Sequence, residues 1–135
     1  MPIVVRVVSA EDYAKWVGEQ KQKVAKSAED DTKSFPLPEL VQRGEKVYAA
    51  NCVACHQATG RGAPPAFPPL AGSKVVTGSE EGQIDVVLNG KPNTAMQSFK
   101  QLGDADIAAV ITFTRNSWGN KASEVQPADV KARRK

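Results

Sequence analysis

The feature that most constrains this chain is a run of five residues, Cys52-Val53-Ala54-Cys55-His56, which holds its only two cysteines and its only histidine. Two thiols one helical turn apart, followed directly by an imidazole, form the pattern by which a c-type haem is attached. Each thiol can add to a vinyl group of the porphyrin, and the imidazole can ligate the iron from the proximal side. The motif therefore predicts one covalently bound haem c, held by Cys52, Cys55 and His56.

Two other kinds of site use the same cysteine spacing. A structural zinc site takes four protein ligands, and the chain offers only three cysteine and histidine residues in total. A thiol–disulfide oxidoreductase places its cysteine pair at the start of a helix that follows a buried strand. Here a helix-like run over residues 38–50 comes before the motif instead. The oxidoreductase remains the alternative from a different class, and it predicts a colourless protein with a reactive thiolate.

The second axial ligand of the iron can be found by elimination. A low-spin electron carrier needs another side chain on the metal, usually a methionine sulfur or a second histidine nitrogen. His56 is already used, and Met1 lies far upstream, which leaves Met96. Residues 90–99 around it are rich in turn-forming residues, as expected of a loop across the distal haem face. The alternative is that Met96 fills a gap in the core, as most methionines do.

Regular apolar spacing predicts three helices, over residues 38–50, over residues 80–89, and from Asp104 towards Trp118. Residues 60–72 are so rich in proline and glycine that we predict a stiff loop without regular structure. A helical unit of this size is marginal without a prosthetic group or a covalent staple. A bound haem would therefore supply much of its apolar core.

The distribution of charge argues against a nucleic-acid-binding patch. Residues 36–121 hold 8 basic and 7 acidic side chains, and residues 1–35 hold 6 of each. Of the formal net charge of +3, most (+2) therefore lies in residues 122–135, which we predict to be a basic flexible tail. This tail is short and lacks aromatic residues, so no nucleic-acid partner is expected.

Residues 37–119 resemble a class I cytochrome c domain over the whole segment. The similarity rests on Gly44 and Tyr48, the haem motif, the Pro-Pro-Leu loop, the methionine loop, and a C-terminal helix with an aromatic residue. It implies an all-α cytochrome c fold, a small helical domain wrapped round one covalent haem. In such a fold, Gly44 and Tyr48 would cross the last helix near Val110 and Phe113.

The same resemblance implies further residues around the haem. The carbonyl of Pro68, or of an adjacent proline in the same loop, would accept the Nδ1 proton of His56. Such a bond fixes the imidazole and tunes its donor strength. Leu70 would pack on the haem ring. Arg61 is a candidate partner for a haem propionate, and the alternative is an ordinary exposed loop arginine.

The first 35 residues lie outside this resemblance. Residues 2–8 are rich in β-branched side chains and predict a strand. Ser9, with Asp12 three residues later, predicts the start of a helix, and residues 20–33 are polar and charged, which predicts a linker. Because a lone strand leaves its edge unpaired, we interpret the chain as a fragment whose upstream part holds the rest of a β-sheet.

Residues 1–16 also resemble the end of the copper-binding domain of cytochrome c oxidase subunit II. In that family a dinuclear copper motif is followed at once by Pro-Ile-x-Val, and Met1 falls on a copper ligand. Without the upstream ligands this chain would hold no copper itself. Some bacterial oxidases of the caa3 type carry a cytochrome c domain after that strand. The resemblance implies that residues 1–35 are a remnant of a cupredoxin-like copper domain with a helix and linker. Residues 36–121 would form the cytochrome c domain, and residues 122–135 the basic tail.

This resemblance implies an electron carrier that is not an enzyme on its own. A redox donor protein or a quinol-oxidising complex would reduce it. It would pass electrons to the copper domain of the same subunit, and the catalytic subunit of the oxidase would reduce oxygen. The alternative is a free-standing periplasmic monohaem cytochrome c, or a haem domain fused to a dehydrogenase, which leaves the strand at residues 2–8 unexplained.

Localisation follows from the same chemistry. Covalent haem attachment of this kind takes place on the outer side of the bacterial inner membrane, so we expect the periplasmic side. No apolar run is long enough for a secretory signal or a membrane span. We therefore expect a membrane-anchored parent protein to supply the export, and this segment to meet the membrane only through the parent complex.

Overall fold

Helices are the regular elements of this protein. The computed structural model describes Val5 and residues 7–134, and this part of the chain contains no strand. Its only sheet-type pairing is an isolated bridge between Ala63 and Phe67. These observations agree with the predicted all-α class. The helices are α1 (Ala10–Asp30), α2 (Leu37–Asn51), α3 (Val53–His56), α4 (Lys74–Thr77), α5 (Glu80–Asn89), α6 (Asp104–Arg115) and α7 (Pro127–Arg133).

The helices predicted from apolar spacing are present at the expected places. Helix α2 covers residues 38–50, α5 coincides with residues 80–89, and α6 begins at Asp104. Residues 60–72 contain no helix, in line with their proline and glycine content. The short helix α4 was not predicted; Ser73 precedes it, and its Oγ accepts a hydrogen bond from the Val76 amide at 3.5 Å.

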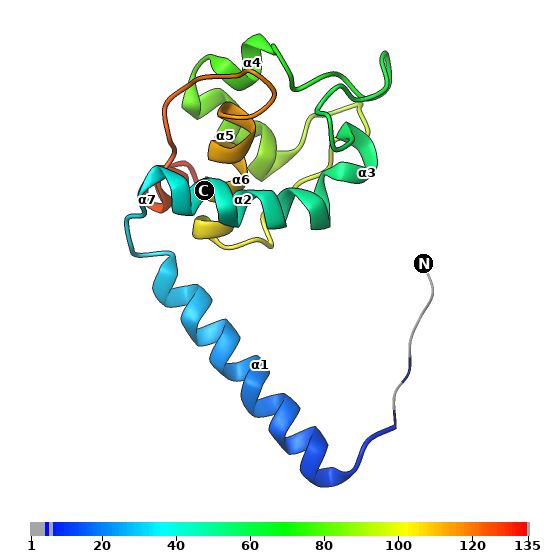
Figure 1. Ribbon diagram of the computed structural model, residues 1–135, viewed down its shortest axis with the longest axis vertical. Coiled ribbons are helices and arrows are strands. Elements are labelled where there is room, and N and C mark those ends of the chain that lie inside the picture. The colour runs from blue at the N-terminus through cyan, green and yellow to red at the C-terminus, as the bar shows by residue number, and fades with distance from the viewer. Residues whose placement is uncertain (1–4, 6, 135) are drawn as a thin grey trace.

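The core is organised around the crossing of α2 and α6 (Figure 1). A Cβ atom added at Gly44 would lie 2.0 Å from the Ala109 carbonyl oxygen and 2.6 Å from the Cβ of Phe113. Only glycine therefore permits this close approach. One turn later, the ring centroid of Tyr48 lies 5.3 Å from that of Phe113. The predicted contact of Gly44 and Tyr48 with the helix that carries Phe113, which is α6, is thus observed. The buried side chains of the core come mainly from α5, α6 and α7, and include Ile84, Leu88, Ile107, Ile111 and Val130.

Residues 125–134 do not form part of the flexible tail that we predicted over residues 122–135. Val125 and Val130 are fully buried, and α7 begins with a capping box between Gln126 and Asp129. Two basic side chains of this segment have acidic partners elsewhere in the fold: Arg133 pairs with Asp85 of α5, and Arg134 pairs with Asp104 of α6. Charge content alone suggested a solvated end because these partners are distant in the sequence.

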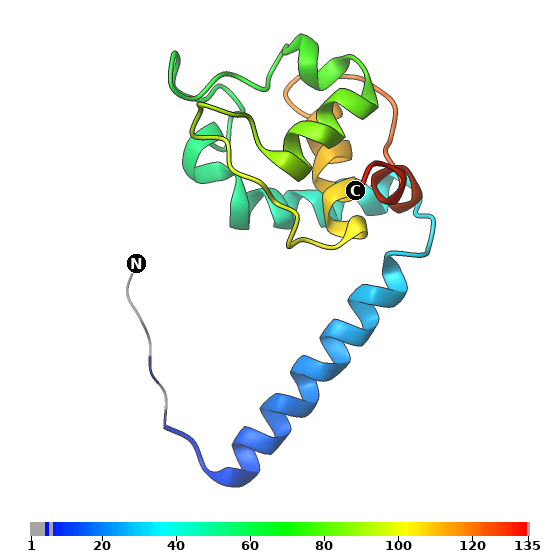
Figure 2. The same ribbon diagram turned by 180° about the vertical axis from the view of Figure 1, so that it is seen from behind.

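Helix α1 is longer than predicted and projects away from the other helices (Figures 1 and 2). It begins as expected, with the Oγ of Ser9 accepting a hydrogen bond from the Asp12 amide at 3.2 Å. It continues to Asp30, through residues for which we predicted a linker. Lysine, glutamine, alanine and glutamate dominate that stretch, and all four are good helix formers. None of the described helices combines the length and the apolar character needed to cross a membrane.

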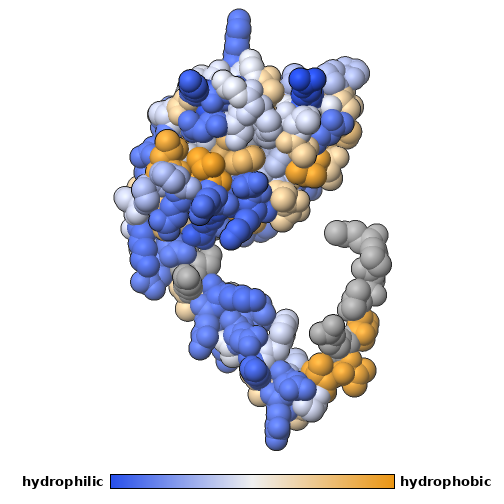
Figure 3. Space-filling model, viewed as in Figure 1, coloured by the Kyte–Doolittle hydropathy of each residue, from blue (hydrophilic) through white to orange (hydrophobic). Residues whose placement is uncertain are grey.

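The strand predicted over residues 2–8 falls largely outside the described residues. Of its members, Val5, Val7 and Val8 are described, and they are exposed and without regular structure. Figure 3 shows apolar surface where the chain enters the start of α1. A strand needs a hydrogen-bonding neighbour, and the described residues offer none here. The predicted remnant of a cupredoxin-like copper domain is therefore not supported.

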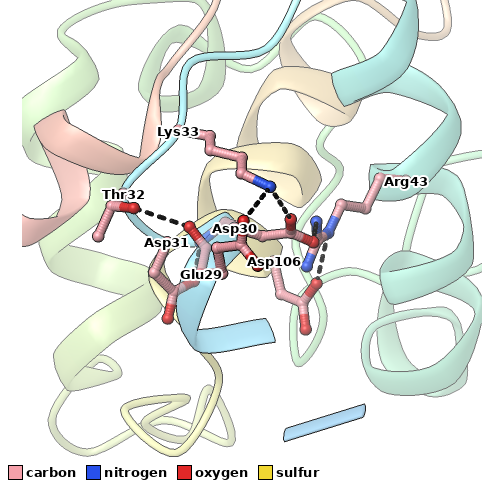
Figure 4. Close-up of polar contacts among 8 residues, drawn as sticks. Glu29, Asp30, Asp31, Thr32, Lys33, Arg43 and Asp106 are labelled. Carbon is pink, nitrogen blue, oxygen red and sulfur yellow. Dashed lines mark hydrogen bonds and ion pairs between the residues drawn. The ribbon is translucent and has the colours of Figure 1, made fainter. Parts of the chain in front are cut away.

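Ionic contacts join the end of α1 to the body of the protein (Figure 4). Arg43 of α2 pairs with Asp30 at 2.9 Å and with Asp106 of α6 at 2.8 Å. The carboxylate of Asp31 accepts a hydrogen bond from the Ala105 amide at 2.7 Å. Gly103, the residue before α6, has no side chain that could cap that helix. Asp31 supplies the cap instead, which fixes the C-terminal end of α1 against α6.

Candidate functional site

The cysteine–histidine motif occupies a single helical turn at the end of α2. The amide of Cys52 donates to the Tyr48 carbonyl at 2.9 Å, so this cysteine closes α2 and precedes α3. The amide of His56 donates to the Cys52 carbonyl at 2.9 Å, which completes the turn. Both cysteines are free and half-buried. The structure thus presents two unpaired thiols and one imidazole within one turn, with Cys52 just before α3 and Cys55 and His56 in it.

The imidazole of His56 is oriented by the proline-rich loop. Its Nδ1 lies 3.2 Å from the carbonyl oxygen of Pro68. Because a carbonyl can only accept, this contact requires the proton on Nδ1, and in the neutral imidazole Nε2 then carries the lone pair that can bind a metal. Pro68 is the proline that makes this contact, and the spacing of the loop prolines alone did not distinguish it from its neighbours.

Gly62 allows the loop to bring Pro68 back to His56. Its amide donates to the His56 carbonyl at 3.0 Å, and its φ angle of +61° lies in the left-handed region. A Cβ atom at this position would lie 2.2 Å from the Phe67 carbonyl oxygen and 2.8 Å from that of Pro68. Next in the chain, Ala63 and Phe67 exchange two backbone hydrogen bonds at 2.7 and 3.0 Å. The Pro68 carbonyl is therefore set by a tightly closed turn.

Two aromatic residues hold the turn that follows His56. The hydroxyl of Tyr48 donates to the Gln57 carbonyl at 2.5 Å, and the indole N–H of Trp118 donates to the Ala58 carbonyl at 2.9 Å. Burial, together with the nearby Cys52 thiol, raises the pKa of Tyr48 to about 12, so the hydroxyl remains protonated as a donor. No role was predicted for Trp118 from the sequence; its place just after α6, the helix that carries Phe113, is the signal that could have indicated one.

Asn120 is a second residue that the sequence analysis missed. Its side-chain oxygen accepts from the Gly72 amide at 2.8 Å, and its side-chain nitrogen donates to the Leu70 carbonyl at 3.1 Å. Asn120 is buried and so closes the far end of the proline-rich loop against the segment after α6. Leu70 itself is half-buried and packs against the core.

Met96 lies in the loop that follows α5, and this loop is hydrogen-bonded back to α5. Its carbonyl accepts from the Lys91 amide at 3.0 Å, and the Phe99 amide donates to the Val87 carbonyl at 2.9 Å. The Met96 side chain is half-buried, whereas the residues on either side of it are exposed. Figures 1 and 2 show this loop, α3 and the proline-rich loop at the same end of the helical body.

The residues present fit a haem better than a metal ion held by protein ligands alone. Among the described residues, no group of three or more His, Cys, Asp and Glu side chains is placed to hold a metal. A haem brings its own equatorial nitrogens and needs only axial donors, which an imidazole and a thioether can supply. Partly exposed apolar side chains that pack against the core offer surface that a flat ring can cover; they include Val53, Leu70, Val87, Leu102 and Trp118.

The same geometry does not favour a thiol–disulfide oxidoreductase. Burial, together with the neighbouring Cys55 thiol, raises the pKa of Cys52 to about 11. The attacking cysteine of such an enzyme has a pKa well below the ordinary value. Cys52 also follows a helix rather than a buried strand.

The structure places the remaining candidate, Arg61, at the exposed surface of the proline-rich loop. Its pairing with a haem propionate stays a prediction. The roles proposed for Cys52, Cys55, His56 and Met96 likewise depend on a bound haem.

Comparisons with known proteins place the chain among c-type cytochromes. A family model described as "Cytochrome C oxidase, cbb3-type, subunit III" matches residues 39–113. Cytochrome c-552 of Thermus thermophilus is 42% identical over 91 residues, which cover 57% of this chain and 69% of that protein. A second cytochrome c-552 sequence from the same organism is also 42% identical over 91 residues, and the match covers 61% of that relative.

Other similar proteins carry names of redox complexes. The cytochrome c subunit of the quinone alcohol dehydrogenase of Gluconobacter oxydans is 38% identical over 90 residues, covering 58% of this chain and 19% of that subunit. The cbb3-type cytochrome c oxidase subunit CcoP of an Azospirillum strain is 32% identical over 88 residues, covering 60% of this chain and 30% of that subunit. The chain therefore matches under a third of these two larger proteins.

Replacing Gly62 with alanine should disturb His56, because the new Cβ would displace the Pro68 carbonyl that faces Nδ1. Gly72 is the matched control: its φ of +71° imposes the same backbone strain, but a Cβ there meets nothing within 4 Å. Each substitution should lower the free energy of unfolding by roughly 1–2 kcal/mol through that strain. Gly62→Ala alone should lower it by a further roughly 1–3 kcal/mol from overpacking and weaken the NMR signal of the His56 ring N–H. Equal effects of the two variants would contradict the described loop geometry.

Proposed function

Because the chain belongs to the family of c-type cytochrome domains described as cytochrome c oxidase, cbb3-type, subunit III, we propose that it is a one-electron carrier with one covalent haem c. The observation that carries this proposal is the geometry of the motif: two free thiols and an imidazole on one helical turn, with Nδ1 held by the Pro68 carbonyl. Bound haem would supply a one-electron iron couple, and the protein would catalyse no reaction of its own.

Different residues of the chain would bind the porphyrin, ligate the iron and orient the ligand. Cys52 and Cys55 would form thioether bonds to the two vinyl groups, and His56 would ligate the iron through Nε2. Its Nδ1 contact to Pro68, at 3.2 Å, would fix the ring orientation and strengthen its donation. Met96, which is half-buried, would supply the second axial ligand from a loop at the same end of the molecule. A neutral thioether favours a higher reduction potential than a second imidazole does.

We further propose that the electron acceptor is the dinuclear copper centre of a caa3-type cytochrome c oxidase, on the periplasmic side of the bacterial inner membrane. The support is the resemblance of residues 1–16 to oxidase subunit II. The donor would be a redox protein or a quinol-oxidising complex. Covalent linkage to the copper domain would make the second transfer intramolecular, so a weak interface would suffice. The near balance of charge over residues 36–121, 8 basic and 7 acidic, suits transient contacts.

The second candidate is a free-standing periplasmic monohaem cytochrome c. The observation that favours it is the similarity to cytochrome c-552, in which the matched segment makes up 69% of the relative. The chemistry of the site is the same in both candidates. They differ in the acceptor and in the part played by residues 1–35.

Replacing Met96 with alanine tests the distal ligand. We expect the low-spin absorption spectrum of the haem-loaded protein to be lost, because the thioether is removed while His56 is unchanged. Met96→His should restore a low-spin spectrum at a lower reduction potential. Gln97→Ala, a change at the exposed neighbouring residue, should leave both properties as they are. An unaltered spectrum in Met96→Ala would rule out this residue as the ligand.

The acceptor can be tested by stopped-flow mixing. The reduced, haem-loaded protein should be oxidised by the isolated dinuclear copper domain of a caa3-type oxidase, and more slowly by a cbb3-type oxidase, which is the matched comparison. Raising the ionic strength should change the rate only slightly, because the helical domain carries little net charge. Preferential oxidation by the cbb3-type enzyme, or no oxidation by the copper domain, would contradict the caa3 proposal and leave the electron-carrier proposal standing.

A further inference from the structure

The loop that carries Met96, residues 90–103, is anchored at two points along its second half. The first anchor is α5: the Phe99 amide donates to the Val87 carbonyl at 2.9 Å, and the Ser98 hydroxyl donates to the Leu88 carbonyl at 2.5 Å. The second anchor comes from the end of α7, more than thirty residues later in the chain. It consists of one side chain, Arg134.

Arg134 holds the stretch by which the loop enters α6. Its Nη1 donates to the Lys100 carbonyl at 2.9 Å, and its Nη2 donates to the Leu102 carbonyl at 2.5 Å. Its Nε donates to the carboxylate of Asp104, the first residue of α6, and the two side chains form an ion pair. The planar, five-donor guanidinium is suited to serve three acceptors at once, which a lysine ammonium on a flexible stem does less well.

The contacts of Arg134 are partly buried, so their loss would cost stability. The Asp104 side chain is 11% exposed and that of Arg134 is 30% exposed. Removing the guanidinium would leave a largely buried carboxylate without this partner and two loop carbonyls without their donor. The backbone that carries Arg134 is itself fixed, because its amide donates to the carbonyl of Val130 at 3.2 Å and Val130 is fully buried.

We propose that Arg134 is a positioning residue for Met96: it ties the downstream end of the loop to the core and keeps the thioether in place as the distal ligand. The inference rests on the proposed function, since it concerns Met96 as a haem ligand. A thioether is a poor donor to ferric iron, so its retention depends on how firmly the loop is held. Through Arg134, the C-terminal segment would then support the site, although it lies far from the haem motif in the sequence.

The test compares two neighbouring arginines in the full-length, haem-loaded protein. Arg134→Gln removes the three contacts to residues 100–104, whereas Arg133→Gln, the matched control, removes contacts to α5 only. We expect Arg134→Gln to raise the hydrogen-exchange rates of the amides of residues 91–103 by about tenfold. It should also lower the pH and the temperature at which the ferric absorption band of methionine ligation is lost. Arg134→Lys should recover part of both effects, and Arg133→Gln should show neither.

Two results would overturn the inference alone. One is an Arg134→Gln protein whose exchange rates and methionine band match those of the wild type. The other is equal behaviour of Arg133→Gln and Arg134→Gln, which would indicate a general loss of stability. A wild-type protein without the methionine band would overturn the proposed distal ligand, and this inference with it.

Discussion

The close crossing of α2 over α6 is the contact on which the rest of the structure depends. Gly44 brings the α2 backbone onto the Ala109 carbonyl, and any side chain at that position would separate the helices. The crossing places the Tyr48 ring 5.3 Å from both the Phe113 and the Trp118 rings. Tyr48 and Trp118 then bind the two carbonyls that follow His56. A backbone contact in the core thus determines where the cysteine–histidine turn lies and how its exit is held.

From that turn outward, the site consists of two loops attached to a rigid helical body. The proline-rich loop is closed by Gly62 near His56 and by Asn120 at its far end. The Met96 loop is attached to α5 and, through Arg134, to the end of α7. Neither loop contains a helix over its central residues, so the positions of Pro68 and Met96 depend on these attachments. This arrangement suits an electron carrier, because a fixed ligand geometry limits the rearrangement that accompanies each change of oxidation state.

Local patterns in the sequence predicted the parts of the fold that have local causes. The spacing of Ile84, Val87 and Leu88 predicted α5, and the five-residue motif predicted the turn that carries both cysteines and His56. Two parts were missed because their causes are not local. Arg133 and Arg134 look like a solvated basic end until their partners Asp85 and Asp104 are known. Likewise, the polar composition of residues 20–33 predicts a linker, although Asp31 fixes the end of this stretch at the start of α6.

The candidate site shows the same division. Cys52, Cys55 and His56 could be proposed as haem-binding residues from their spacing, and Met96 by elimination, because few residues of the right chemistry exist in the chain. The supporting contacts of Trp118 and Asn120 could not be predicted, because each joins residues that lie far apart in the sequence, by 60 and 50 positions respectively. The upstream copper domain inferred from residues 2–8 has no support in the described part of the chain, where no partner strand is present.

The central claim is a covalent haem on the two cysteines, and intact mass spectrometry under denaturing conditions tests it most directly. The protein should be produced in a bacterial host that has the haem-attachment machinery, and a Cys52→Ala/Cys55→Ala variant should be produced in parallel. We predict a mass equal to the polypeptide plus one haem for the unaltered chain, with no thiol available to alkylation, and the polypeptide mass alone for the variant. A colourless chain at the polypeptide mass, with both thiols open to alkylation, would contradict the account.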